Sequence, residues 1–337
     1  MQYHSATAQA AYHDLRRSLI DDQVAAIRGT PTQETRKGRK YWYDTYRVGD
    51  DVKKAYIGEA TAEMEARIAG HLKLSKDTKV RAESRTRLVR ILRAEGFLPV
   101  DGASGRLYNA LARAGVFRLG GTVVGTHAFR HYEGELGIRM AQDEVAQTND
   151  LDIAQFERLS LALGDQVDEP LAATFADLEF APVPSLSGPA VWKWRQTKND
   201  TYIEFLTPSF RPEEDIRNLP ALGVAAQSLH FLNYLIAEPI KAAALYRSGV
   251  LIQIPRPERY AIHKLIVAHR RRAGPDQLKS RKDRAQAALL IDALAEDRPD
   301  ELREAYQDAM ERGPQWRAHI TATLNRMPDT AAKLAAL

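Results

Sequence analysis

Apolar residues recur at helical spacing near the N-terminus, where Ala11, Leu15 and Leu19 predict a helix over residues 5–28. Two aromatic and β-branched runs follow, and the Gly49-Asp50-Asp51 turn between them predicts a β-hairpin over about 40–58. Three helical patterns come next, at 60–73, 76–95 and 104–115. Residues 1–115 are therefore predicted to form a mostly helical region with one aromatic hairpin.

The pattern changes at Val116 to short strands that alternate with helices. Strands are predicted at 119–124, 150–153, 191–194 and 202–206, with two or three more within 229–254. Helices are predicted between them at about 126–136, 155–163 and 170–177. We therefore expect an α+β core over residues 116–257 that contains a mixed sheet.

After Glu258 the pattern is helical to the last residue. Four breaks divide this stretch into separate helices, at Gly274-Pro275, Pro299, Gly313-Pro314 and Pro328. The sequence therefore predicts a C-terminal helical region over residues 258–337.

The composition is that of a soluble globular protein, with 44% hydrophobic and 27% charged residues in a chain of 337. No segment approaches the roughly 20 apolar residues that a membrane span requires. The N-terminal residues lack the basic and apolar regions of a signal peptide. There is no cysteine, which excludes disulfides and thiolate metal sites. We expect a cytoplasmic protein with no membrane partner.

The net charge of +4 is small, but the basic residues are clustered. Clusters lie at Arg36–Lys40, at Lys73–Arg93, and from His269 through Lys282. Such clusters are suited to nucleic acid or to nucleotide phosphates, so RNA is a possible partner of the N-terminal cluster and of residues 264–282. The alternative is that these residues form solvated helix faces.

Two segments carry candidate chemistry. The predicted strand that ends at Val124 leads through Gly125 and Thr126 into a helix, and this arrangement offers free N–H groups and a hydroxyl to a phosphate. Asp150 and Asp152 are two residues apart on a predicted strand, so both carboxylates face the same side and supply the oxygen ligands that Mg²⁺ prefers. The alternatives are an ordinary strand-to-helix turn and a pair of surface carboxylates.

A third carboxylate, Glu204, interrupts the apolar strand 202–206. If this strand lies beside the strand of Asp150 and Asp152, the three carboxylates converge and could hold two divalent cations about 4 Å apart. The alternative is a salt bridge from Glu204 to Lys193 or Arg195 on the preceding strand.

Other side chains have mainly structural interpretations. His127 and His131 have the i, i+4 spacing of metal ligands, but no third ligand is evident in the sequence. His263 lies among core residues. The aromatic residues of the hairpin could stack on bases, or could pack within the hairpin or across a dimer.

Taken together, these motifs resemble the nucleotidyltransferase superfamily typified by polymerase β. Val124-Gly125-Thr126, Asp150-Leu151-Asp152 and Glu204 match its pattern in order and in flanking hydrophobicity. The flanking residues, with Pro255-Arg256-Pro257-Glu258-Arg259-Tyr260, resemble a bacterial group of nucleotidyltransferase-fold proteins over roughly residues 85–300. The gap between Gly125 and Asp150 is longer than is usual in the superfamily, and it implies an insertion around 137–147.

The resemblance implies a mixed-sheet nucleotidyltransferase core that transfers a nucleoside monophosphate from an NTP, such as ATP, to an acceptor hydroxyl. It assigns Mg²⁺ or Mn²⁺ to Asp150, Asp152 and Glu204, and the triphosphate to Gly125, Thr126, Lys264 and Lys282. Lys279 and Arg259 are further basic candidates. The acceptor could be RNA, protein or a small molecule, and residues 137–149 could form a loop or a lid. The alternative function is a catalytically silent protein that binds nucleotide or nucleic acid, and a homo-oligomer is possible.

Overall fold

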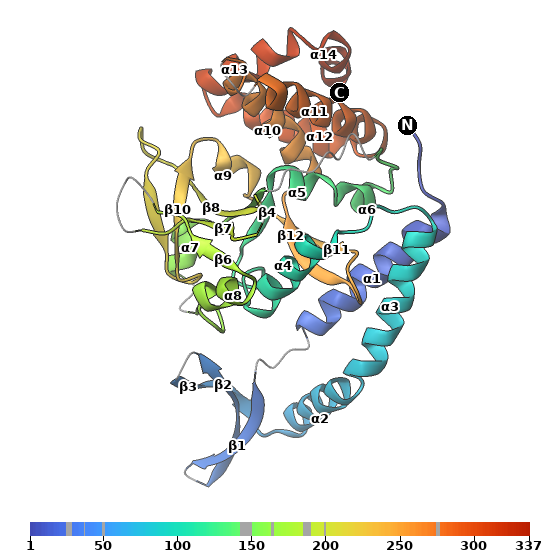
Figure 1. Ribbon diagram of the computed structural model, residues 1–337. Coiled ribbons are helices and arrows are strands. Elements are labelled where there is room, and N and C mark those ends of the chain that lie inside the picture. Colours follow the sequence, from blue (N-terminus) through green and yellow to red (C-terminus); the bar gives the residue numbers. More distant parts are fainter. Residues whose placement is uncertain are drawn as a thin grey trace.

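The central sheet lies between a group of C-terminal helices and an N-terminal arm that carries a second, smaller sheet (Figure 1). The structure is a computed structural model that describes residues 1–24, 29–36, 38–48, 51–141, 150–162, 165–184, 190–198, 200–273 and 277–337. The predicted loop or lid at 137–149 falls largely outside these residues, because 142–149 are not among them.

The N-terminal region contains α1 (Ala6–Val24), a three-stranded antiparallel sheet, and the helices α2 (Ala62–Lys76), α3 (Thr78–Ala94) and α4 (Gly102–Arg113). The predicted hairpin is confirmed as β2 (Arg39–Val48) and β3 (Asp51–Glu59). A third strand, β1 (Thr30–Arg36), pairs with β2 and was not predicted. Its sequence, TPTQETR, has no apolar alternation because neither of its faces is deeply buried.

The central sheet has the strand order β4-β5-β8-β10-β9, and β7 also pairs with β8. Parallel and antiparallel pairs both occur, so the predicted α+β fold with a mixed sheet is confirmed. Its strands are β4 (Thr122–Val124), β5 (Asp150–Ala154), β6 (Phe180–Pro182), β7 (Lys193–Gln196), β8 (Tyr202–Pro208), β9 (Ile216–Leu219) and β10 (Val224–Leu229). Two short helices, α7 (Glu157–Ala162) and α8 (Leu171–Asp177), lie within this part of the chain.

The helix predicted over 126–136 is two helices, α5 (Gly125–Phe129) and α6 (Tyr132–Leu136). The His131 amide donates to the Ala128 carbonyl, which tightens the turn and ends α5 after a few residues. The strands predicted within 229–254 are β11 (Ile240–Ala244) and β12 (Val250–Ile254), which form a separate two-stranded sheet after α9 (Leu232–Leu235).

The C-terminal region is helical as predicted, with α10 (Pro257–Arg270), α11 (Gln277–Asp297), α12 (Pro299–Glu311), α13 (Pro314–Leu324) and α14 (Pro328–Ala335). Proline begins four of these five helices, at the first-turn position where the missing N–H costs no hydrogen bond. No helix in the described part of the chain is long and apolar enough to cross a membrane.

The main apolar core joins the central sheet to α10 and α11. A second cluster joins α1 and α3 to β11 through Leu15, Leu92 and Ala243. The body that carries the candidate site is thus anchored to the first and third helices, while the three-stranded sheet lies at the far end of α2 (Figure 1).

Candidate active site

Two rows of polar side chains cross one face of the central sheet. In the first row, Asp152 of β5 pairs in register with Glu204 of β8, which pairs in register with Lys193 of β7. In the second row, Asp150 pairs with Tyr202, which pairs with Arg195. Register partners on adjacent strands face the same side of a sheet, so the three predicted acids lie on one surface.

The opposite face of these strands is apolar. Leu151, Ile153, Ile203, Phe205 and Trp194 alternate with the polar residues and are all buried. This burial fixes the register, because a slip by one residue would turn every carboxylate into the core. The burial of Leu151 and Ile153 therefore explains why Asp150 and Asp152 both face the other side of the sheet, as predicted.

Lys193 is the immediate partner of Glu204. Its Nζ lies 2.6 Å from Glu204 Oε1 and 4.2 Å from the centroid of the Tyr202 ring. The salt bridge that the sequence left open as an alternative for Glu204 is present. Arg195 instead pairs with Asp200 at 2.5 Å, because antiparallel register places it opposite Tyr202.

The two aspartates hold negative charge that their surroundings compensate only in part. Burial, then Glu204 and Asp150, raise the pKa of Asp152 to about 7, against the opposing effect of Arg271 and Lys264. Burial and Glu204 also raise the pKa of Asp150, while Lys193 and Lys279 lower it. A cation placed between these carboxylates would relieve both effects.

Gly125 makes the close approach of β4 to Asp152 possible. Its φ is +64°, and a Cβ at this position would lie 2.6 Å from Asp152 Oδ2. Glycine is therefore needed for both the backbone conformation and the space. Thr126 follows in the first turn of α5 and is half-buried beside the carboxylates' strand.

Helices α10 and α11 supply the charges behind Asp152. Lys264 is buried, and its Nζ donates to Asp283 Oδ1 at 2.6 Å. Arg271 donates to the other Asp283 oxygen at 3.0 Å. The Tyr260 hydroxyl donates to the Gly125 carbonyl at 2.9 Å, which ties α10 to the turn that carries Gly125 and Thr126.

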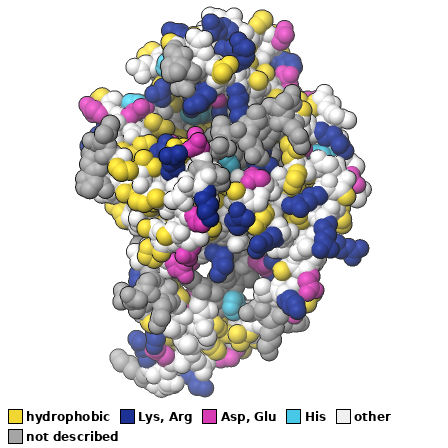
Figure 2. Space-filling model, in the orientation of Figure 1, with side chains coloured by type: hydrophobic (Ala, Val, Ile, Leu, Met, Phe, Trp, Pro, Cys, Tyr) yellow, Lys and Arg dark blue, Asp and Glu magenta, His cyan; other side chains and the backbone are white. Residues whose placement is uncertain are grey.

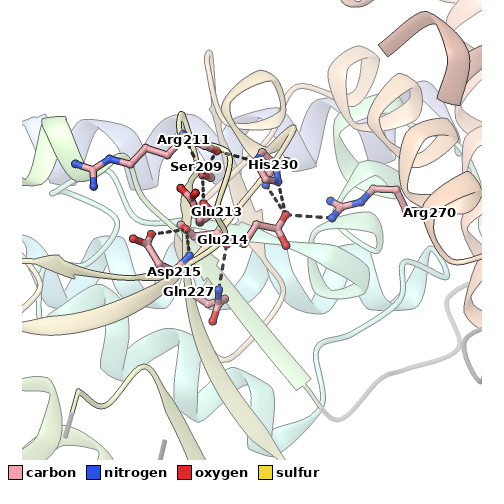
Figure 3. Close-up of polar contacts among 9 residues, drawn as sticks. Ser209, Arg211, Glu213, Glu214, Asp215, Gln227, His230 and Arg270 are labelled. Atoms are coloured by element: carbon pink, nitrogen blue, oxygen red, sulfur yellow. Dashed lines mark hydrogen bonds and ion pairs between the residues drawn. The ribbon is translucent and has the colours of Figure 1, made fainter. Parts of the chain in front are cut away.

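A polar network holds the C-terminal end of α10 against the sheet (Figure 3). Glu214 Oε1 accepts hydrogen bonds from the His230 backbone at 2.8 Å and from Arg270 at 3.1 Å, and lies 2.9 Å from His230 Nδ1. His230 Nε2 lies 2.9 Å from the Arg211 carbonyl. Arg270 therefore pairs with Glu214, whereas the adjacent Arg271 pairs with Asp283 beside the site.

A cavity of about 690 Å³ lies on the side of Leu151 and His127, and Asp150, Asp152 and Glu204 are not among its lining residues. Arg106 is the basic residue in its lining. The acidic residues in the lining are Asp101, Asp177, Glu179 and Asp200. This lining is unsuited to a triphosphate. On the carboxylate face, by contrast, the charges of Lys193, Lys279 and Arg271 act on the aspartates.

The donor chemistry of the site fits a divalent cation. Asp150 and Asp152 present carboxylate oxygens, and burial together with the neighbouring carboxylates raises the pKa of both. Glu204, however, is bound to Lys193. Within the described ranges, no set of three or more His, Asp or Glu side chains is arranged to hold a metal ion. The three-carboxylate metal site thus stays a prediction, with Asp150 and Asp152 as the ligands best placed to hold a cation.

The comparison with protein families decides the classification. A family model described as nucleotidyltransferase matches residues 103–311, more than half of the chain. The chain belongs to this nucleotidyltransferase family. A second model, of a domain of unknown function (DUF6788), matches residues 11–66.

The chain is also similar to the crystal structure of an antigenic nucleotidyltransferase-like protein from Paracoccidioides brasiliensis. The identity is 11%, the match covers 71% of this chain and 95% of that chain, and the TM-score is 0.41. No curated protein matches the sequence.

The structure of this nucleotidyltransferase family member brings Gly125, Asp150, Asp152 and Glu204 together, but it places the predicted lysines differently. Lys264 is held by Asp283, so a direct contact with phosphate would require that ion pair to open. Lys282 is half-buried, and burial followed by repulsion from Lys264 lowers its pKa. Direct phosphate contacts by these two lysines stay predictions.

Other candidates have structural roles in this nucleotidyltransferase. Arg259 pairs with Asp308 at 2.7 Å and lies over the Tyr234 ring. His127 and His131 are buried, and each lies beside the Tyr108 hydroxyl. His263 is also structural: burial lowers its pKa to about 3.

Three residues that shape the site were not predicted to have these roles: Arg271 and Asp283 behind Asp152, and Tyr260 beneath Gly125. One signal was present in the sequence. Tyr260 and Lys264 are at i and i+4, which places them on one face of α10, and Arg271 is the residue that follows the helix.

Proposed function

We propose that this protein is a metal-dependent nucleotidyltransferase of the polymerase-β-like type, which transfers a nucleoside monophosphate from an NTP to an acceptor hydroxyl. The observation that carries the proposal is the row in which Asp152 and Glu204 are register partners, with Asp150 two residues away on the same face. Membership of a nucleotidyltransferase family supports the reaction class.

In the proposed reaction, the acceptor oxygen forms a bond to the α-phosphorus, and the bond from that phosphorus to the bridging oxygen breaks. Pyrophosphate leaves, and the acceptor proton passes to a carboxylate or to water. Asp150 and Asp152 would hold Mg²⁺ or Mn²⁺, which would supply charge stabilisation to the phosphates. Glu204 would help to complete the site and activate the acceptor once it is released from Lys193.

The turn at Gly125 and Thr126 would lie against the triphosphate, with a hydroxyl and a backbone that can be approached closely. Arg271 and Lys264 are cations whose charges act on Asp152, and Lys193 and Lys279 act on Asp150. The Arg271 side chain is 40% exposed and that of Lys264 only 7%, so Arg271 is the better placed of the two to meet the phosphates directly, whereas Lys264 would act through space on Asp152.

One observation favours a second function, a catalytically silent protein that binds nucleotide or nucleic acid. The Lys193 ammonium already compensates Glu204, so the row could be neutralised without a second cation. Under this alternative, Asp150 and Asp152 would bind a nucleotide–metal complex that is not turned over.

Metal-dependent transfer of label from an α-³²P NTP separates the two functions. The wild type is compared with Asp150→Asn/Asp152→Asn in the presence of lysate as a source of acceptors. Label that depends on the aspartates supports transfer, whereas NTP binding without transfer supports the silent alternative.

A further inference from the structure

The three-stranded sheet of the N-terminal arm presents an open face of tyrosines. Tyr41, Tyr43 and Tyr56 lie on the same side because Tyr43 and Tyr56 are register partners and Tyr41 is two residues from Tyr43. The Tyr56 ring centroid lies 6.1 Å from that of Tyr41 and 5.8 Å from that of Tyr43. Tyr56 is 60% exposed, so this group of rings reaches solvent. We call these three residues the tyrosine face.

The first turn of helix α2 contacts the other side of the same sheet. A Cβ at Gly58 would lie 2.5 Å from the Met64 side chain, and Gly58 is the register partner of Trp42. Gln33 also bonds across to Glu65 of α2 at 3.1 Å. Helix α2 therefore contacts one side of the sheet, and the tyrosine rings lie on the other side, where they contact one another and Tyr56 is exposed.

Basic side chains border the tyrosine face. The Arg36 guanidinium lies 5.1 Å from the Tyr43 ring centroid, and Arg36 and Arg39 are both exposed at the β1–β2 turn. Lys and Arg side chains are visible at this lower end of the molecule in Figure 2. Arg36 and Lys54 form ion pairs with Glu34, and Arg39 lies 3.8 Å from Glu59, but ion pairs between solvent-exposed side chains contribute little.

Rings spaced along a sheet and flanked by cations match single-stranded nucleic acid. Bases stack on aromatic rings whatever their sequence, and sheet-based RNA-binding domains stack two or three bases in this way. Glu34, on the same face as Tyr41, adds a carboxylate acceptor that a ribose 2′-hydroxyl can donate to and deoxyribose cannot.

We propose that the tyrosine face binds single-stranded RNA, with bases stacked on Tyr41, Tyr43 and Tyr56 and phosphates on Arg36 and Arg39. If this RNA is also the acceptor, that assignment rests on the nucleotidyl transfer proposed above. The proposal that the tyrosine face binds RNA does not depend on that reaction. The site lies on an arm that joins the body through α2 and α3, and the DUF6788 match at residues 11–66 includes the whole sheet.

The test is fluorescence anisotropy of a 5′-labelled 12-nucleotide single-stranded RNA with the full-length protein, in the absence of NTP. Tyr41→Ala/Tyr43→Ala/Tyr56→Ala should weaken binding at least ~10-fold, because each lost stacking contact costs about that factor. Tyr41→Phe/Tyr43→Phe/Tyr56→Phe should bind within ~3-fold of wild type, because the rings remain. Arg36→Gln/Arg39→Gln should reduce the slope of log K against log salt by about 1.4, because each lost phosphate contact on a single strand contributes about 0.7.

Phe210→Ala is the matched control, because Phe210 is an exposed aromatic residue under Arg158 but lies outside this sheet, and it should bind RNA as wild type does. Asp150→Asn/Asp152→Asn should also bind RNA normally, so a failure of catalysis stays distinct from a failure of this proposal. The proposal is overturned if the triple alanine variant binds like wild type, or if DNA of the same sequence binds as tightly. It is also overturned if the tyrosines affect only self-association of the chain.

Discussion

Lys193 Nζ lies 2.6 Å from Glu204 Oε1, at the end of a row in which Glu204 is the register partner of Asp152. This lysine compensates one carboxylate of the site and lowers the pKa of Asp150 as well. Its removal should leave the carboxylates with more uncompensated negative charge.

We therefore expect Lys193→Gln to bind Mn²⁺ more tightly than the wild type, by roughly tenfold, which corresponds to about 1.4 kcal/mol. Titration calorimetry with Mn²⁺ measures this. Arg195→Gln is the control, because Arg195 lies two residues away on β7 and pairs with Asp200. Equal affinities in the wild type and Lys193→Gln would show that Lys193 does not modulate the cation site.

Asp152 should make the metal-free protein less stable as the pH rises. Its pKa in the folded protein is about 7, above the ordinary value of 3.8, so the folded state holds the proton more tightly than the unfolded state. The tighter proton binding contributes its full stabilisation to the folded protein below about pH 4. This stabilisation is lost as the pH rises to about 7. Asp152→Asn should therefore be more stable than the wild type at pH 7.5 by up to a few kcal/mol, at about 1.4 kcal/mol per pKa unit, but not at pH 4. Urea unfolding in EDTA measures the difference, and a constant gap at both pH values would contradict the prediction.

Gly125→Ala should damage the site through both strain and contact. A left-handed alanine costs about 1–2 kcal/mol, and its Cβ would push on the Asp152 carboxylate. Gly223→Ala isolates the strain, because Gly223 has the same φ of +64° and nothing within 4 Å of its built Cβ. Thermal unfolding should show similar losses for the two variants, or a larger loss for Gly125→Ala, whereas only Gly125→Ala should lose label transfer. Full transfer by Gly125→Ala would show that Asp152 tolerates displacement.

Asp283 should be critical to stability because it compensates two cations. Asp283→Ala leaves the buried Lys264 without its carboxylate and frees Arg271, at an expected cost of about 3–5 kcal/mol. Asp300→Ala removes an exposed partner of Arg303 and should cost less than about 1 kcal/mol. Chemical denaturation measures the free energy of unfolding of both variants. Similar small decreases in the two would mean that the Lys264 ammonium is hydrated in the folded Asp283→Ala variant.

The sequence was sufficient to predict the face shared by Asp150 and Asp152, because strand alternation fixes it locally. It left the partner of Glu204 open between Lys193 and Arg195, since that choice depends on the register of two antiparallel strands, and register places Lys193 opposite Glu204. It also gave no reason to bury Lys264, because burial of that side chain depends on Asp283 from a different helix. The strand β1 was missed because its residues carry no apolar pattern.

Transfer of label from an α-³²P NTP tests the central claim most directly. With Mg²⁺ or Mn²⁺ and lysate acceptors present, the wild type should form a labelled product, and Asp150→Asn/Asp152→Asn should form at least ~100-fold less. EDTA should abolish the wild-type signal. Equal labelling by the double variant, or no labelling by the wild type with any NTP, would contradict the assignment of nucleotidyl transfer to this site.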